Sequence, residues 1–128
     1  MWFRDQKHEM SYKNLVAKHC ANEQSSGYLS ALYILAALNK NGLLETVDVP
    51  ECGLNFDLLL DAALSWSAGE RALLRIAATL YNPYMWPTAI DDVFRHLNQT
   101  DFETALQALR LKYGRESGMG FETSSRTA

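Results

Sequence analysis

The stretch SGYLSALYILAALN, residues 26–39, decides the fold that we expect for this chain. Wound as an α-helix at about 100° per residue, it points apolar side chains in every direction around its axis. The uncharged run that contains it, residues 24–39, includes Gln, Ser and Asn and is shorter than the roughly 18–20 apolar residues of a membrane span. A helix that is apolar on all sides needs neighbours around it, so we predict the central helix of a soluble bundle.

Amphipathic stretches on both sides of this segment supply the surrounding helices. Apolar residues recur every three or four positions over residues 5–20, 55–65, 67–81, 88–97 and 100–113, and each stretch predicts a helix. Between residues 43 and 54 the pattern is open, since a helix extension at 43–44 and a short extended segment at 47–50 both fit. The predicted fold is all-α, an irregular bundle of five or six helices around a central apolar helix.

The ends of two helices carry capping patterns. Ser67 with Glu70, and Thr100 with Glu103, match the capping box, in which each residue satisfies a backbone amide of the other. The predicted buried face of the last helix consists of Phe102, Ala105, Leu106, Leu109 and Tyr113. Gly114 is expected to end that helix. The chain therefore divides into a helical domain over residues 1–114 and a polar tail over 115–128 that we expect to be disordered.

Composition excludes several classes of function. The 128 residues fit one domain, 48% of them are hydrophobic, and a formal net charge of −3 gives no basic surface for nucleic acid. Cys20 and Cys52 lack the spacing of a metal site, and no apolar segment of a signal peptide follows the N-terminus. We expect a cytoplasmic protein without metal, cofactor, nucleic-acid or membrane partner.

Arg71 and Arg75 form one candidate site, because they lie one turn apart on the polar side of the predicted helix 67–81. Two guanidinium groups on one face suit the oxygens of a phosphate or a carboxylate. The alternative is a solvated face whose charges pair within the helix or with an acidic neighbour such as Asp57 or Asp61.

Histidines and carboxylates elsewhere have structural explanations that we favour over metal binding or catalysis. His8 and His19 share a helix face but lie about 16 Å apart, too far to bind one ion. We expect His19 to border the core and His8 to be partly solvated. Asp91 and Asp92 lie in the first turn of their helix and His96 near its end, where the helix dipole favours each charge. We identify no catalytic residue.

An aromatic loop, residues 82–87, follows the helix 67–81 and carries large side chains between two prolines. Aromatic residues and methionine are enriched in the cores of protein interfaces, which makes the loop a candidate partner surface. The candidate residues are Tyr81, Tyr84, Met85 and Trp86. The alternative is a plug that folds onto the bundle, as large aromatic side chains between helices usually do.

The segment WSAGERALLRIAATLYN, residues 66–82, together with the apolar ALYIL at residues 31–35, resembles a family of small all-helical bacterial proteins of unknown function. The resemblance covers roughly residues 3–113. It implies a helical protein of the bacterial cytoplasm and transfers no catalytic residue. A regulatory or phage-associated role stays open.

The functional prediction is a non-enzymatic protein-protein interaction module that self-associates as a homodimer. The large supply of apolar side chains outside the helical stripes favours it, because a monomer rarely exposes a large apolar patch. The alternative is a protein that binds a small anionic ligand with Arg71 and Arg75 beside the aromatic loop. A third hypothesis is a hydrolase that uses Asp57, Asp61 and a histidine.

Overall fold

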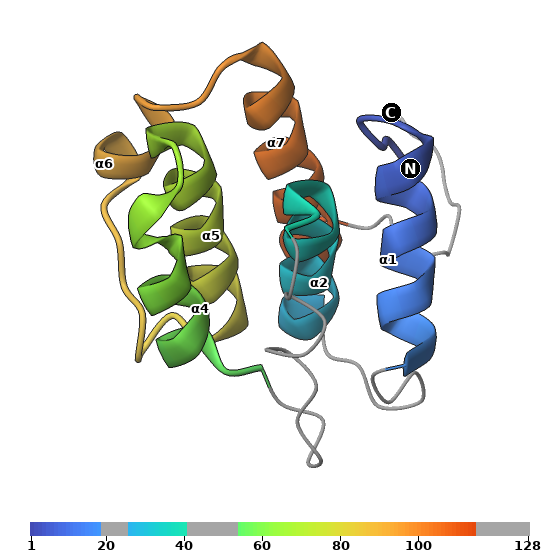
Figure 1. Ribbon diagram of the computed structural model, residues 1–128, viewed down its shortest axis with the longest axis horizontal. Coiled ribbons are helices and arrows are strands. Elements are labelled where there is room, and N and C mark those ends of the chain that lie inside the picture. Colours follow the sequence, from blue (N-terminus) through green and yellow to red (C-terminus); the bar gives the residue numbers. More distant parts are fainter. Residues whose placement is uncertain (19–25, 41–53, 115–128) are drawn as a thin grey trace.

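The fold is all-α, as the sequence predicts. A computed structural model describes residues 1–18, 26–40 and 54–114, and in these residues every regular element is a helix. The elements are α1 (Gln6–Lys18), α2 (Ser26–Leu38), α4 (Phe56–Ala62), the 3-10 helix η1 (Ala63–Ser65), α5 (Ala68–Tyr81), α6 (Ile90–Phe94) and α7 (Gln99–Tyr113) (Figure 1). The predictions for His19, both cysteines, the 47–50 segment and the tail concern residues outside the described ranges.

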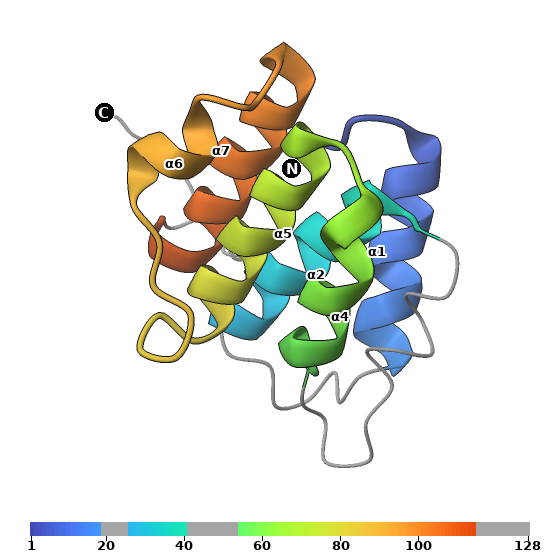
Figure 2. The same ribbon diagram turned by 60° about the vertical axis from the view of Figure 1, so that its left-hand side comes forward.

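Helix α2 lies between α1 on one side and α5 on the other, and α7 contacts it as well (Figures 1 and 2). Nearly all of its residues are buried, which is why an all-round apolar sequence is stable there. Leu32 and Leu35 of α2 and Leu73 of α5 are buried in the shared core, as the positions of their apolar arcs predict. No helix in the described part of the chain combines the length and apolarity that crossing a bilayer requires.

The first turn of α2 and the last turn of α5 touch through their backbones. A Cβ atom added to Gly27 would lie 2.6 Å from the carbonyl oxygen of Leu80, so only glycine permits this approach. The same carbonyl accepts a hydrogen bond of 2.8 Å from the Lys112 ammonium of α7. Three helices therefore meet at Leu80, and the lysine satisfies an acceptor at the end of α5.

One of the two predicted capping boxes is confirmed. The Ser67 hydroxyl accepts from the Glu70 amide at 3.2 Å, and the Glu70 carboxylate accepts from the Ser67 amide at 3.2 Å. The other is wrong, because α7 begins at Gln99 and its cap is Asn98, whose side chain accepts from the Asp101 amide at 2.8 Å. Asparagine is among the strongest N-caps, and its position two residues earlier adds about half a turn to the helix.

The predicted buried face of α7 is only partly right: Ala105 is buried and Leu109 packs half-buried against the core, but Phe102 and Tyr113 are exposed. The buried residues are Asp101, Thr104, Ala105, Gln107, Ala108 and Leu111. The large side chains of α2 leave little room beside them, so α7 presents small and polar side chains there. Thr104 donates its hydroxyl proton to the Thr100 carbonyl, and Gln107 accepts from the Trp2 amide, so neither polar group is buried without a partner.

The helix expected at 55–65 is present over nearly that whole range, as α4 followed directly by the 3-10 turn η1. The helix expected at 88–97 is shorter and is reduced to α6, Ile90–Phe94. Val93 is the buried residue of α6, while Ile90, which the helical pattern places on the same face, is exposed. A five-residue helix buries one anchor and leaves its first turn in solvent.

Candidate functional site

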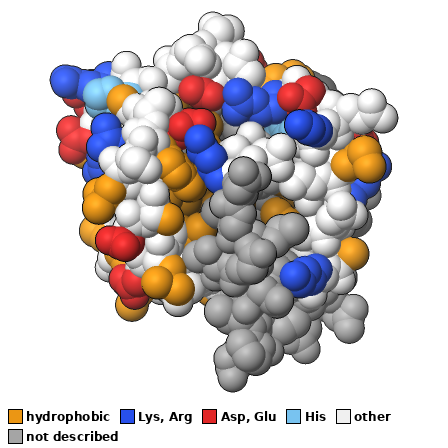
Figure 3. Space-filling view, viewed as in Figure 1, with side chains coloured by type: hydrophobic (Ala, Val, Ile, Leu, Met, Phe, Trp, Pro, Cys, Tyr) orange, Lys and Arg blue, Asp and Glu red, His pale blue; other side chains and the backbone are white. Residues whose placement is uncertain are grey.

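Three helices and a loop form one side of the bundle, which comes forward in Figure 2. We call it the α4–α6 face and define it by exposed or half-exposed side chains of α4, η1, α5, the aromatic loop, α6 and the turn after α6. These are Asp57, Asp61, Leu64, Arg71, Arg75, Tyr84, Met85, Trp86, Asp92 and His96. In Figure 3, acidic, basic and apolar side chains are interspersed on the left-hand side, where α4 and α6 lie in Figure 1.

Arg71 and Arg75 line a pocket of about 230 Å³ between α5 and α6. Ala68 and Ala72 also line this pocket, together with Asp92 of α6 and His96 of the turn after α6, so the lining contains both signs of charge. Within the described residues the guanidinium of Arg71 makes no ion pair or hydrogen bond. The pocket is thus lined by the guanidinium of Arg71, which has no partner among the described residues, and by the carboxylate of Asp92.

Arg75 connects this pocket to the aromatic loop. Its guanidinium donates to the Thr88 hydroxyl at 2.9 Å, and it lines a second pocket of about 150 Å³. The other residues around that pocket are Leu60 of α4, Ala78 of α5, and Trp86, Pro87 and Thr88. The structure therefore places Arg75 beside the loop, as the sequence hypothesis requires, and Arg71 on the side of α6.

The aromatic loop and the residue before it divide between core and solvent. Tyr81 points inward, where its ring contacts Phe56 and Tyr28 and its hydroxyl accepts from the Leu54 amide at 3.1 Å. Trp86 is half-buried against the core. Its carbonyl accepts from the Thr79 hydroxyl at 2.5 Å.

Tyr84 and Met85 point outward, with 95% and 64% of their surface exposed. The Asn82 side chain accepts from both of their amides, at 3.2 and 3.1 Å, and the Asn82 carbonyl accepts from the Trp86 amide at 3.0 Å. This local network fixes the turn. The loop is thus partly a core plug and partly a rigid display of two apolar side chains.

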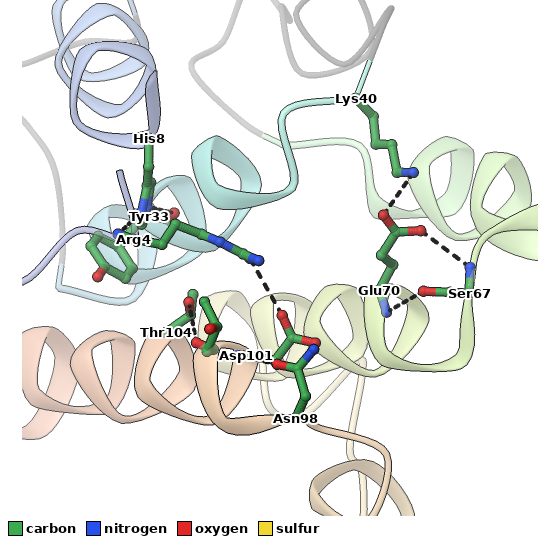
Figure 4. Close-up of polar contacts among 10 residues, drawn as sticks. Arg4, His8, Tyr33, Lys40, Ser67, Glu70, Asn98, Asp101 and Thr104 are labelled. Carbon is green, nitrogen blue, oxygen red and sulfur yellow. Dashed lines mark hydrogen bonds and ion pairs between the residues drawn. The ribbon is translucent and has the colours of Figure 1, made fainter. Parts of the chain in front are cut away.

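A second polar network connects the N-terminal segment with α2, the first turn of α5 and α7 (Figure 4). Arg4 forms an ion pair with Asp101 at 3.4 Å, and Lys40 forms one with Glu70 at 2.8 Å. The ammonium of Lys40 lowers the pKa of Glu70. A cavity of about 310 Å³ adjoins these pairs. Arg4, Glu70 and Asp101 in its lining already form ion pairs within the fold.

His8 lies within that network and is buried, which corrects the expectation that it is partly solvated. One ring nitrogen, Nε2, lies 2.9 Å from the Tyr33 carbonyl oxygen, and the other, Nδ1, accepts from the Arg4 amide at 3.1 Å. This geometry requires the neutral tautomer with its proton on Nε2. Burial lowers the pKa of His8, and the nearby Arg4 charge acts in the same direction, although the bond to the Tyr33 carbonyl opposes it.

Metal binding and hydrolysis receive no geometric support from the described residues. Among them, no group of three or more His, Cys, Asp or Glu side chains could hold a metal ion. The cavities next to His8 and His96 include neither Asp57 nor Asp61 in their linings. Asp91 instead pairs with Arg95 at 3.0 Å along its own helix.

Comparison with known proteins adds no residue role. No family model, no curated protein and no solved structure matches this chain. The assignment of function therefore rests on the chemistry of the α4–α6 face alone.

Proposed function

We propose that this protein is a non-enzymatic protein-protein interaction module of the bacterial cytoplasm, and that it self-associates as a homodimer through the α4–α6 face. The observation that carries the proposal is Tyr84, an aromatic side chain with 95% of its surface in solvent on a turn fixed by hydrogen bonds. An exposed aromatic side chain on a rigid backbone loses little conformational entropy on binding, so most of its burial contributes to affinity.

The composition of the surrounding surface supports the same proposal. Met85 and Leu64 are largely exposed, and Arg71 and Arg75 lie between the loop and α6. Tyrosine, tryptophan and arginine dominate the residues whose truncation weakens protein interfaces, and methionine is enriched at interface cores. The face combines these residue types on adjoining elements.

Light scattering on the purified protein at tens of micromolar tests the proposal. We expect a dimer mass for the native chain and a monomer mass for the variant Tyr84→Ser/Met85→Ser. Two exposed residues away from the face provide a matched control, Tyr113→Ser/Met10→Ser, which should remain dimeric. A monomer mass for the native chain contradicts self-association, and a dimer that tolerates the loop variant removes the loop from the interface.

A second candidate function is the binding of a small anion by Arg71 and Arg75. The pocket that they share with His96 favours it, although Asp92 in the same lining opposes an anionic ligand. Titration calorimetry with inorganic phosphate and with citrate tests this candidate. Binding that Arg71→Ala abolishes supports it, and the absence of binding at millimolar ligand contradicts it.

A further inference from the structure

Unpaired charges are concentrated on the α4–α6 face. Most charged side chains in the described residues have an ion-pair or hydrogen-bond partner. Those without one are Lys7, Asp57, Asp61, Arg71 and Asp92. All except Lys7 belong to α4, α5 and α6, and Arg75 on the same face has only the neutral Thr88 hydroxyl as partner.

The two acidic residues of α4 form a row on its exposed side. Phe56, Leu59 and Ala63 bury the opposite side of this helical segment against the core. Asp57 and Asp61 are one turn apart, about 6 Å along the axis, and both are exposed. Like charges at this spacing repel each other within the chain, so cations from a second molecule would stabilise the row.

Arg71 and Arg75 form a second row on the exposed side of α5, with the same spacing of one turn. α4 and α5 run side by side (Figures 1 and 2). Leu60 of α4 and Arg75 of α5 line one pocket together with Trp86. No ion pair joins the rows within one copy. Two rows of opposite charge and equal spacing are therefore left without a charged partner among the described residues.

We propose that a second copy of this chain docks on this face with its two rows exchanged, so that Asp57 and Asp61 of each copy meet Arg71 and Arg75 of the other. This inference rests on the proposed self-association and specifies its geometry. A two-fold axis that lies in the interface plane, parallel to the rows and between them, places the carboxylate row of each copy opposite the guanidinium row of the other. An axis perpendicular to the rows in the same plane would oppose like charges and is disfavoured.

The apolar part of the face fits the same arrangement. The pocket that Leu60 and Trp86 line beside Arg75 belongs to the docked face in this arrangement. Leu64, which is 71% exposed and follows the acidic row in the chain, becomes buried when the second copy docks. The apolar contacts supply affinity, while the charges fix the register and orientation.

Charge exchange tests the inference on the full-length protein. Asp57→Lys/Asp61→Lys and Arg71→Glu/Arg75→Glu should each raise the dimer dissociation constant at least tenfold, because each opposes like charges at both contacts. An equimolar mixture of the two variants should form a heterodimer, since every contact then joins opposite charges. The variant with all four substitutions should again be a homodimer, and Lys7→Glu, an unpaired charge on α1, should leave dimerisation unchanged.

The outcomes separate this inference from the proposed function. A native chain that is monomeric by light scattering overturns both. If the native chain is a dimer and both two-residue variants are dimers too, the pairing of carboxylates with guanidinium groups across the interface is overturned, while self-association itself is still supported. Dissociated variants that do not combine when mixed also overturn the reciprocal pairing. Circular dichroism verifies that each variant is folded. The neutral variants Asp57→Asn/Asp61→Asn and Arg71→Gln/Arg75→Gln replace any charge-exchange variant that unfolds. We expect these neutral variants to dimerise more weakly, and an unchanged dissociation constant would overturn the pairing.

Discussion

The polar network around α1 and the α4–α6 face are built from the same residue types but use them differently. Around α1, Arg4 of the N-terminal segment pairs with Asp101 of α7, and both ring nitrogens of His8 have hydrogen-bond partners inside the protein. On the α4–α6 face, Asp61 and Arg71 have no partner in the described residues, and Tyr84 faces solvent. Charges that are paired internally hold the bundle together, and charges that are left unpaired beside apolar side chains are available to a partner.

Truncation of a leucine should produce the largest difference in unfolding free energy between a substitution in the core and one on the α4–α6 face. Leu73 is fully buried in the core between α2 and α5, so Leu73→Ala should destabilise the fold by about 2–5 kcal/mol through lost burial and a cavity. Leu64 is 71% exposed, and Leu64→Ala should leave the unfolding free energy of the monomer nearly unchanged. Urea denaturation at low protein concentration measures both. Similar losses at the two positions would contradict the assignment of core and face.

Replacement of a carboxylate should produce the next largest difference in unfolding free energy between the polar network and the α4–α6 face. Asp101→Asn removes the partner of Arg4, whose side chain is only one-quarter exposed, and should cost about 1–3 kcal/mol of stability. Asp61→Asn removes an exposed charge without a partner and should change the unfolding free energy very little. Comparable urea midpoints for the two variants would show that the Arg4–Asp101 pair contributes nothing to the fold.

Helix α5 shows how far the sequence predicts the fold. Ser67 and Glu70 form the predicted cap, and Leu73 and Leu74 lie on the predicted buried side. Both features depend on residues within four positions of one another, where helical geometry alone decides. The same local reasoning places Arg71 and Arg75 on the exposed side of this helix.

Features that depend on a distant neighbour were not predictable. His8 is buried because it meets the carbonyl of Tyr33, 25 residues away, under the folded-back N-terminal segment. The face of α7 is set by α2, which selects Ala105 and Ala108 over Leu106 and Leu109. The division of the aromatic loop depends likewise on Thr79 and Leu54, which bind Trp86 and Tyr81.

A smaller effect distinguishes the true cap of α7 from the predicted one. Asn98→Ala removes the acceptor of the Asp101 amide and should cost about 1 kcal/mol, whereas Thr100→Ala should cost clearly less. The signal for Asn98 is present in the sequence, since Asn98 precedes Asp101 by three residues, but the capping box at Thr100 competes with it. Thermal unfolding followed by circular dichroism ranks the two variants, and a larger loss for Thr100→Ala would reverse the assignment.

Mild acid should cause the smallest loss of stability among these tests, because it only adds a proton to His8 and removes no side-chain atoms. Burial lowers the pKa of His8 in the folded state below its ordinary value of 6.5, so the unfolded chain binds the proton first as the pH falls. The contribution of His8 is therefore complete above pH 6.5 and is lost as the pH falls from 6.5 toward the folded-state pKa. A proton on Nδ1 would also face the Arg4 amide, which is itself a donor.

Urea unfolding between about pH 7.5 and pH 5 measures this loss, in a window above the normal titration range of the carboxylates. The native chain should lose stability over this range, and His8→Gln should remove most of the dependence. His96→Gln, a substitution on the exposed α4–α6 face, should retain it, because that imidazole has no buried partner to lose among the described residues. A native chain with equal stability at both ends of the range would mean that the bonds of His8 to Tyr33 and Arg4 do not depend on its neutral form.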